Sequence, residues 1–251
     1  MYLLLCMLAL TEIGISTCVV LKALCIFWFG FKSITMDGCI TQIFFLYFLT
    51  GVHSAILVTM AFDCYVAIGD PLRYATILTN ARIAKLGLVC FIRAVLFLPG
   101  PLLLQRLPFC FNCIIPHTYC EHNAVVKMSC GYTRVNWMYS LVITFVIIGL
   151  DLIFIGLSYG LIIRAFLRIS SKKTHWKALN TCTAHICVML MSYTPNLFST
   201  LTHRFSQDIA SHIHIILTNL YLLVTPIFNP IIYGVKTREF REKVRKYTCR
   251  M

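Results

Sequence analysis

The chain has 251 residues, of which 59% are hydrophobic and only 12% are charged, and its mean hydropathy is +0.81. This composition excludes an ordinary soluble domain and favours a polytopic membrane protein. A helix needs about 20 apolar residues to cross the hydrocarbon core, so the chain has room for roughly six or seven spans and for no large domain outside the membrane.

Six apolar stretches predict six transmembrane helices, so the expected fold class is an all-α membrane protein built as one helical bundle. The stretches are Tyr2–Phe29, Ile40–Ile68, Ile83–Leu104, Trp137–Ile163, Ala178–Leu201 and Ile209–Val235. Residues 1–235 therefore form the bundle, with a long connection over residues 105–136 on its outer side. Residues 236–251 are expected to form a basic cytosolic tail with a short amphipathic helix.

The net charge of +13 would suit a nucleic-acid-binding protein, but most of the 22 Lys and Arg residues follow the second, fourth and sixth stretches. These residues are Arg73, Arg82, Lys85, Arg164, Arg168, Lys172, Lys173, Lys177 and those of the segment Lys236–Arg250. The positive-inside rule places these segments in the cytosol, together with both ends of the chain. Basic residues therefore report orientation, and the pattern argues against a nucleic-acid partner. The opening Met1–Leu5 lacks basic residues and a small-residue cleavage site, so we expect it to begin a span.

This orientation places five of the 13 cysteines on the outer side, where disulfides persist. They are Cys39, Cys110, Cys113, Cys120 and Cys130. The connection 105–136 is long for a compact bundle, so we expect disulfides to staple it. Five cysteines cannot all pair, and spacing alone leaves the connectivity open.

Two short matches to catalytic or metal-binding patterns have simpler explanations. Residues 156–160 read G-x-S-x-G, but the serine hydrolase pattern requires a strand, a sharp turn and a helix, and this match lies in the middle of a span. Cys182, His185 and Cys187 are metal-binding residue types, yet positions 182 and 187 point to different faces of a helix. We therefore expect neither an enzyme nor a bound metal.

Ionisable residues at membrane depth are costly and usually face the interior of a bundle. Glu12, His53 and Asp151 are the main examples here. Glu12 and His53 each lie about ten residues, or about 15 Å, from the expected cytosolic edge, so they can form a pair. The alternative is two separate side chains, each bonded to backbone or water. Such residues also form relays in proton-coupled transporters, but the repeats and interrupted helices that transporters show in two halves are missing from this sequence.

One segment resembles a family signature closely. Met60–Ile68 together with Asp70–Tyr74 is similar to the olfactory-receptor pattern M-A-[YF]-D-R-Y-V-A-I-C-x-P-L-R-Y. Further segments resemble landmarks of the same family in the expected order, namely Pro116–His122, Lys177–His185, His203–Phe205 and Asn229–Gly234. The run His203–Phe205, Phe62 and the segment Thr76–Thr79 are most similar to the class I, or fish-like, branch.

The resemblance implies a rhodopsin-like, multi-pass receptor of the plasma membrane that binds small odorants without a cofactor and activates a stimulatory, olfactory-type G protein. Met1–Leu3 resembles the start of the family's second helix, so the six stretches correspond to family helices two to seven. We therefore expect the first helix to be missing and delivery or signalling to be impaired. A non-signalling remnant of a receptor remains the alternative.

The resemblance also implies roles for individual residues. It pairs Cys39 with Cys120 and Cys110 with Cys130, and leaves Cys113 over. It assigns activation and G-protein coupling to Asp63, Cys64, Tyr65, Tyr159, Tyr193, Asn229, Pro230 and Tyr233. Where the family has an arginine after Asp63, this chain has Cys64, so the ionic latch of the family is lost. Where the family has an Asp and Glu pair that can hold sodium, this chain has Glu12 and His53, and a protonated imidazole would repel a cation.

A ligand site is expected between the outer halves of the spans. Helical spacing places Leu46, Tyr47, Thr50 and Gly51 on one face of the second span, and Thr200 and Arg204 on one face of the fifth. Arg204 would favour ligands that carry a carboxylate. Ordinary helix packing would equally explain Tyr47 and Thr50, and a side chain that reaches to the interface would explain Arg204.

Overall fold

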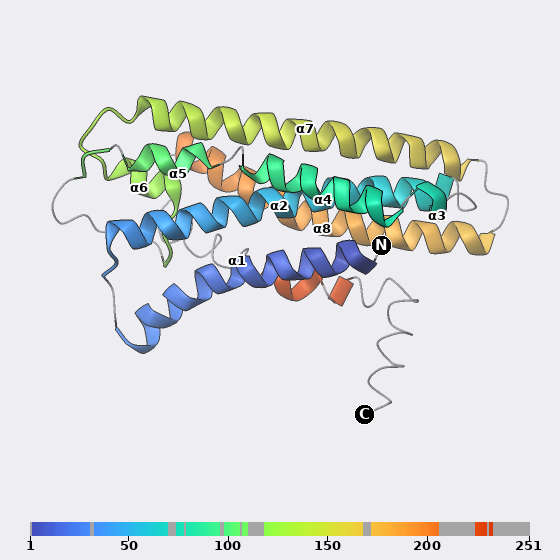
Figure 1. Ribbon diagram of the computed structural model, residues 1–251, viewed down its shortest axis with the longest axis horizontal. Coiled ribbons are helices and arrows are strands. Elements are labelled where there is room, and N and C mark those ends of the chain that lie inside the picture. The colour runs from blue at the N-terminus through green and yellow to red at the C-terminus, as the bar shows by residue number, and fades with distance from the viewer. Residues whose placement is uncertain are drawn as a thin grey trace.

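The computed structural model describes residues 2–30, 33–69, 74–77, 79–95, 98–105, 107–109, 118–167, 172–205, 224–229 and 231–232. Its long helices are α1 (Tyr2–Trp28), α2 (Met36–Gly69), α4 (Asn80–Val95), α7 (Arg134–Phe166) and α8 (Lys172–Phe205). The short helices are α3 (Tyr74–Ile77), α5 (Pro99–Leu104) and α6 (His122–Lys127). The long helices run side by side along the longest axis, with α7 along one edge of the view and α1 along the other (Figure 1).

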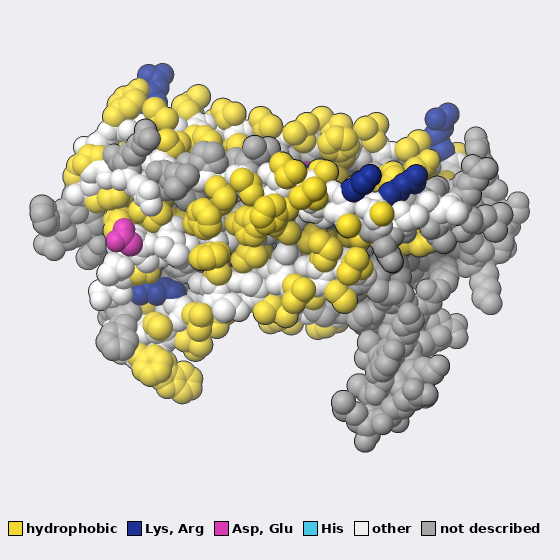
Figure 2. Space-filling view, viewed as in Figure 1, with side chains coloured by type: hydrophobic (Ala, Val, Ile, Leu, Met, Phe, Trp, Pro, Cys, Tyr) yellow, Lys and Arg dark blue, Asp and Glu magenta, His cyan; other side chains and the backbone are white. Residues whose placement is uncertain are grey.

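Within the described parts of the chain, three helices are long and apolar enough to cross a membrane, namely α1 from Leu3, α2 and α7. Helix α8 contains a shorter apolar segment, Cys182–Thr194, and its polar first turns begin before the predicted span. Apolar side chains cover much of the visible surface of the bundle, including the length of α7 (Figure 2). A helix that is apolar on all sides suits lipid, because lipid tails solvate its outer face.

The predicted third span, Ile83–Leu104, differs from the structure because it is divided between α4 and α5. Pro99 stands at the start of α5, where a residue without an N–H group is tolerated. A proline inside a continuous helix would remove a backbone hydrogen bond and clash with the preceding turn, so the division follows from the sequence. Of the predicted sixth span, only residues 224–229 and 231–232 are described, and they are helical. The predicted tail, residues 236–251, lies outside the described residues.

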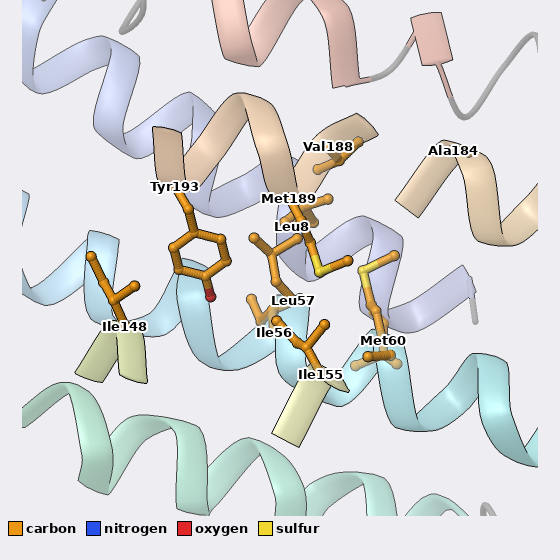
Figure 3. Packing of buried hydrophobic residues seen from close by; sticks show 12 residues of the cluster. Leu8, Ile56, Leu57, Met60, Ile148, Ile155, Ala184, Val188, Met189 and Tyr193 are labelled. Carbon is orange, nitrogen blue, oxygen red and sulfur yellow. The ribbon is translucent and has the colours of Figure 1, made fainter. Parts of the chain in front are cut away.

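Helix α2 lies at the centre of the bundle and contacts α1, α4, α7 and α8. Ile56 and Leu57 of α2 are fully buried in an apolar cluster that also contains Leu8, Ile155 and Met189 from three neighbouring helices (Figure 3). Because the central helix touches most of the others, a displacement of any neighbour changes packing against α2.

A disulfide bond and the hydrogen bonds of one glutamine connect the outer end of α2 to neighbouring segments. Cys39 is bonded to Cys120, and their Cα atoms are 5.5 Å apart. The Gln42 amide donates to the Cys18 carbonyl at 2.7 Å, and its oxygen accepts from the Cys120 backbone N–H at 3.0 Å. These bonds join α1, α2 and the long outer connection. Cys130 is also disulfide-bonded; Cys110 and Cys113 lie outside the described residues.

Candidate functional site

The outer part of the candidate site lies where α2 meets α6 and α7. The ring of Tyr47 packs against that of His122, with centroids 5.6 Å apart. The Ser140 hydroxyl of α7 donates to the Asn123 side-chain oxygen at 3.2 Å. Helix α6 therefore contacts both α2 and α7 in this outer part of the bundle. Sequence reasoning predicted Tyr47 but missed α6, because a helix of six residues gives too short a pattern to recognise.

The other predicted ligand residues differ in how far the bundle buries them. On α2, Leu46 is half-buried, Gly51 is buried and Thr50 is exposed, so the predicted face is only partly enclosed. On α8, Thr200 and Arg204 lie one turn apart in the backbone, but their side chains are outside the described part of the structure.

His122 is 3% exposed, and burial lowers the pKa of its imidazole below the ordinary value. The ring is therefore neutral at pH 7 and supplies no positive charge to the outer region. A cation for an acidic ligand would have to come from another residue.

A buried ion pair lies deeper in the bundle. Asp151 of α7 is 0% exposed, and its Oδ1 lies 2.5 Å from Nη2 of Arg93 on α4. The Tyr193 hydroxyl of α8 donates to the Asp151 Oδ2 at 2.8 Å, and Arg93 also donates to the Ser54 hydroxyl of α2 at 3.3 Å. One polar group from each of four helices thus meets at one point. We call Ser54, Arg93, Asp151 and Tyr193 the four-helix polar network.

Sequence reasoning included Asp151 and Tyr193 but missed Arg93. The sequence did contain a signal for Arg93, because a charged residue inside the predicted third span is costly and indicates a partner. Its partner was not readable from spacing, since positions 93 and 151 lie on different helices.

A second buried polar group joins α1, α2 and the helical residues 224–229. His53 Nε2 lies 3.5 Å from Glu12 Oε1, and the Asn229 side-chain amide donates to the same oxygen. The three side chains are all buried. The structure thus brings together Glu12 and His53, which the sequence placed at one depth, and adds Asn229 to them.

The donor set of this group does not suit a sodium ion. Glu12 Oε1 faces an amide donor and an imidazole nitrogen, which either carries a proton or presents a single lone pair. Hard cations prefer several oxygen ligands. Glu12 is the one carboxylate among these three side chains.

At the inner end, Asp63 and Cys64 have different surroundings. The Tyr74 hydroxyl of α3 donates to Asp63 Oδ1 at 2.7 Å. Burial and the neighbouring carboxylate raise the pKa of Tyr74, so its hydroxyl stays protonated and available as a donor. Cys64 is buried in an apolar cluster with Ile162 of α7 and Cys182 of α8.

A histidine connects three helices about two turns of α2 before Cys64. His185 Nε2 of α8 lies 3.1 Å from the Leu57 carbonyl of α2, and its Nδ1 lies 3.0 Å from the Tyr159 hydroxyl of α7. A carbonyl can only accept, so a neutral ring carries its proton on Nε2 and accepts from Tyr159 on Nδ1. The Tyr159 hydroxyl also lies 3.2 Å from the Cys182 carbonyl.

Among the described residues, the remaining predicted positions do not come together as a catalytic site. Ser158 of the G-x-S-x-G match lies within α7, and its hydroxyl donates to the Phe154 carbonyl at 2.9 Å, one turn back. Tyr65 is half-buried with its ring centroid 6.2 Å from that of Phe62. Pro230 and Tyr233 lie outside the described residues.

Comparison with known proteins identifies the family. A profile of the family described as olfactory receptor matches residues 1–251. Olfactory receptor 52P1 of Homo sapiens is 50% identical over 244 residues, which make up 97% of this chain and 76% of that receptor. Olfactory receptors 52N2 and 52N4 of Homo sapiens are 47% and 48% identical over 249 and 246 residues, which make up 98% and 97% of this chain and 78% and 77% of those receptors. The chain belongs to the class I branch of the olfactory receptor family, so it is a multi-pass, non-enzymatic G-protein-coupled receptor of the plasma membrane.

Proposed function

We propose that this receptor binds small odorants between the outer halves of its helices and couples to a stimulatory, olfactory-type heterotrimeric G protein. The observation that carries the proposal is that side-chain contacts between helices occur at three depths of the bundle. They are the Tyr47–His122 ring contact near the outer end, the four-helix polar network, and the contacts of His185 with Leu57 and Tyr159 toward the inner end. Such contacts are directional, so they can have two distinct arrangements, as a ligand-controlled switch requires.

The six predicted spans correspond, on this proposal, to family helices two to seven. Helices α1, α2 and α7 would be the second, third and fifth family helices, and α4 with α5 would be the fourth. Helix α8 and residues 209–235 would be the sixth and seventh. The support is the order of the family landmarks along the chain and the length of α1, α2 and α7. Residues 1–235 then form the bundle, and residues 236–251 form the basic tail.

The ligand site is proposed to include Leu46, Tyr47, Thr50 and Gly51 of α2 with Thr200 and Arg204 of α8. Tyr47 supports this location, because its ring contacts His122 of α6 and packs against the same apolar cluster as Trp137 of α7, where a ligand would contact several helices. The neutral His122 leaves Arg204 as the predicted cation for an acidic ligand. A guanidinium binds a carboxylate through two parallel hydrogen bonds, which favours acids over alcohols.

Cys64 is proposed to weaken coupling to the G protein. A thiol buried with Ile162 and Cys182 carries no charge toward a partner and adds to the apolar contact between α2, α7 and α8. An arginine at this position could pair with Asp63 at rest and turn toward the G protein on activation. The loss of that group affects signalling rather than folding.

Glu12 and His53 are proposed to form an ion pair in place of the sodium site of the family. Their separation of 3.5 Å and their burial support the pair, because an isolated buried charge is costly in a bundle. Asn229 would hold the Glu12 carboxylate in position.

Our first prediction concerns Arg204. Arg204→Ala should reduce the response to carboxylic acids by at least about tenfold in effective concentration, because one charge-assisted contact contributes more than 1.4 kcal/mol. The response to matched alcohols should change much less. Cyclic-nucleotide output in cells, normalised to surface level, measures both. An equal loss for acids and alcohols would contradict charge recognition.

The second prediction concerns Glu12 and His53. A double-mutant cycle with Glu12→Gln and His53→Gln should give a coupling energy of at least about 0.5 kcal/mol in thermal unfolding of the purified protein. Sodium should leave the stability of the starting protein unchanged relative to potassium. Additive effects of the two substitutions, or stabilisation by sodium, would count against the pair.

The third prediction tests the proposed function as a whole. Odorant-dependent cyclic-nucleotide output should be weak in the starting receptor and should rise at least several-fold with Cys64→Arg at equal surface level. Cys187→Arg is the matched control, because Cys187 is half-buried on α8 but lies outside the Cys64 cluster.

Odorant-independent proton flux across the membrane would favour a transporter instead. A surface-exposed protein that never responds, with or without Cys64→Arg, would favour a non-signalling remnant.

A further inference from the structure

A groove opens on the lipid-facing side of α7 at its outer end. One hollow of about 530 Å³ has Tyr132 and Arg134 in its lining, together with Val135, Met138, Val142 and Ile143. A neighbouring hollow of about 500 Å³ shares Tyr132, Arg134 and Met138 and adds Trp137. We call the two hollows together the α7 groove. Their volumes are those of sites that hold small molecules or parts of larger ones.

The polarity of the groove changes along the helix axis. Arg134 is the first residue of α7, and Ile143 lies about 13 Å further into the membrane at 1.5 Å per residue. The charged end therefore lies near the lipid headgroups, and the apolar residues extend through most of one leaflet, which is about 15 Å thick. Tyr and Trp residues beside Arg134 are typical of this interface.

Arg134 has a positive charge that the rest of the described protein does not neutralise. The side chain is exposed, and no ion pair or side-chain hydrogen bond to it is found among the described residues. Val135, Met138 and Val142 below it are each about half exposed, at 55%, 46% and 52%. An occupant would thus meet one cation at the top and an apolar surface beneath it.

From these features we propose that the α7 groove is a binding site for a glycerophospholipid of the outer leaflet. Its phosphate lies at Arg134, and one acyl chain lies along Val135, Met138 and Val142. The fit rests on charge complementarity at the top and on apolar contact over the depth of one leaflet. A sterol or a diacylglycerol offers the apolar part but no anion, and free phosphate offers the anion alone. This inference is independent of the odorant site and of G-protein coupling.

The test uses the purified 251-residue protein, stripped of lipid in detergent, with dioleoylphosphatidylcholine as the probe. Thermal unfolding is followed by the reaction of buried thiols, since Cys64, Cys90 and Cys182 become accessible only when the bundle opens. A lipid that binds the folded state raises the unfolding midpoint in proportion to the logarithm of its concentration. Dioleoylglycerol and inorganic phosphate serve as probes that carry only one half of the proposed ligand.

We expect Arg134→Gln to require about tenfold more phosphatidylcholine for the same rise in midpoint, because a charge-assisted contact is lost. Val142→Trp, which fills the groove, should have a similar effect. Arg164→Gln at the inner end of α7 and Val146→Trp one turn below the groove are the matched controls and should behave like the starting protein. Arg134→Lys keeps a cation and should retain most of the response.

Four results would overturn the proposal. The first is an unchanged lipid-induced rise in midpoint in both Arg134→Gln and Val142→Trp, and the second is an equal loss of that rise in the two control variants. The third is a loss of the rise in Arg134→Lys as large as in Arg134→Gln. The fourth is that dioleoylglycerol or inorganic phosphate alone raises the midpoint as much as phosphatidylcholine does. If Arg134→Gln lowers the midpoint before lipid is added, Val142→Trp still decides the outcome, because it leaves the charge in place.

Discussion

The buried carboxylate of Asp151 sets the strongest constraint on how the helices are arranged. A charge at membrane depth with no exposure needs a partner, and removing one member of such a pair typically costs about 3–5 kcal/mol. Arg93 supplies that partner from α4, so α4 and α7 are held together. Tyr193 adds a hydrogen bond from α8 to the other carboxylate oxygen, and Ser54 adds one from α2 to Arg93. No single helix of the four can rotate without breaking a bond of this network.

The bonds of the network differ in strength, and this difference indicates which helix can move. The Arg93–Asp151 pair joins two opposite charges, whereas the Tyr193–Asp151 bond joins a neutral donor to a carboxylate and contributes about 1.5–3 kcal/mol. On the proposed function, the bond to α8 would therefore be the first to break if a ligand displaced the outer end of that helix. The second connection of α8, through His185 to Leu57 and Tyr159, lies further toward the inner end. A change at Tyr193 therefore reaches the inner end through α8 itself, while α2 stays in place under its disulfide and the Gln42 bonds.

The sequence predicted those parts of the structure that depend on position along one helix. Hydropathy located α1, α2 and α7, and counting residues placed Glu12 and His53 at the same depth, where the structure brings them within 3.5 Å. It missed contacts whose partners are revealed only by how the helices are arranged around one another. Arg93 can be assigned to Asp151 only when the positions of α4 and α7 are known, and the same holds for His185, whose partners are 128 and 26 residues away along the chain. Hydropathy also marks only the part of a helix inside the membrane, which is why the polar first turns of α8 were left out of the predicted span.

The most direct test of this account is whether the Tyr193–Asp151 bond holds α8 in its resting position. Trp176, which is 64% exposed near the inner end of α8, becomes the sole tryptophan after Trp28→Phe and Trp137→Phe, and its fluorescence then reports on that end of the helix. A carboxylic-acid odorant that stabilises the protein against heat should shift the Trp176 emission. Tyr193→Phe should move the emission of the unliganded protein toward the liganded value, while Tyr132→Phe at the outer surface should not. The same resting emission and the same odorant-induced shift in Tyr193→Phe as in the starting protein would contradict the account.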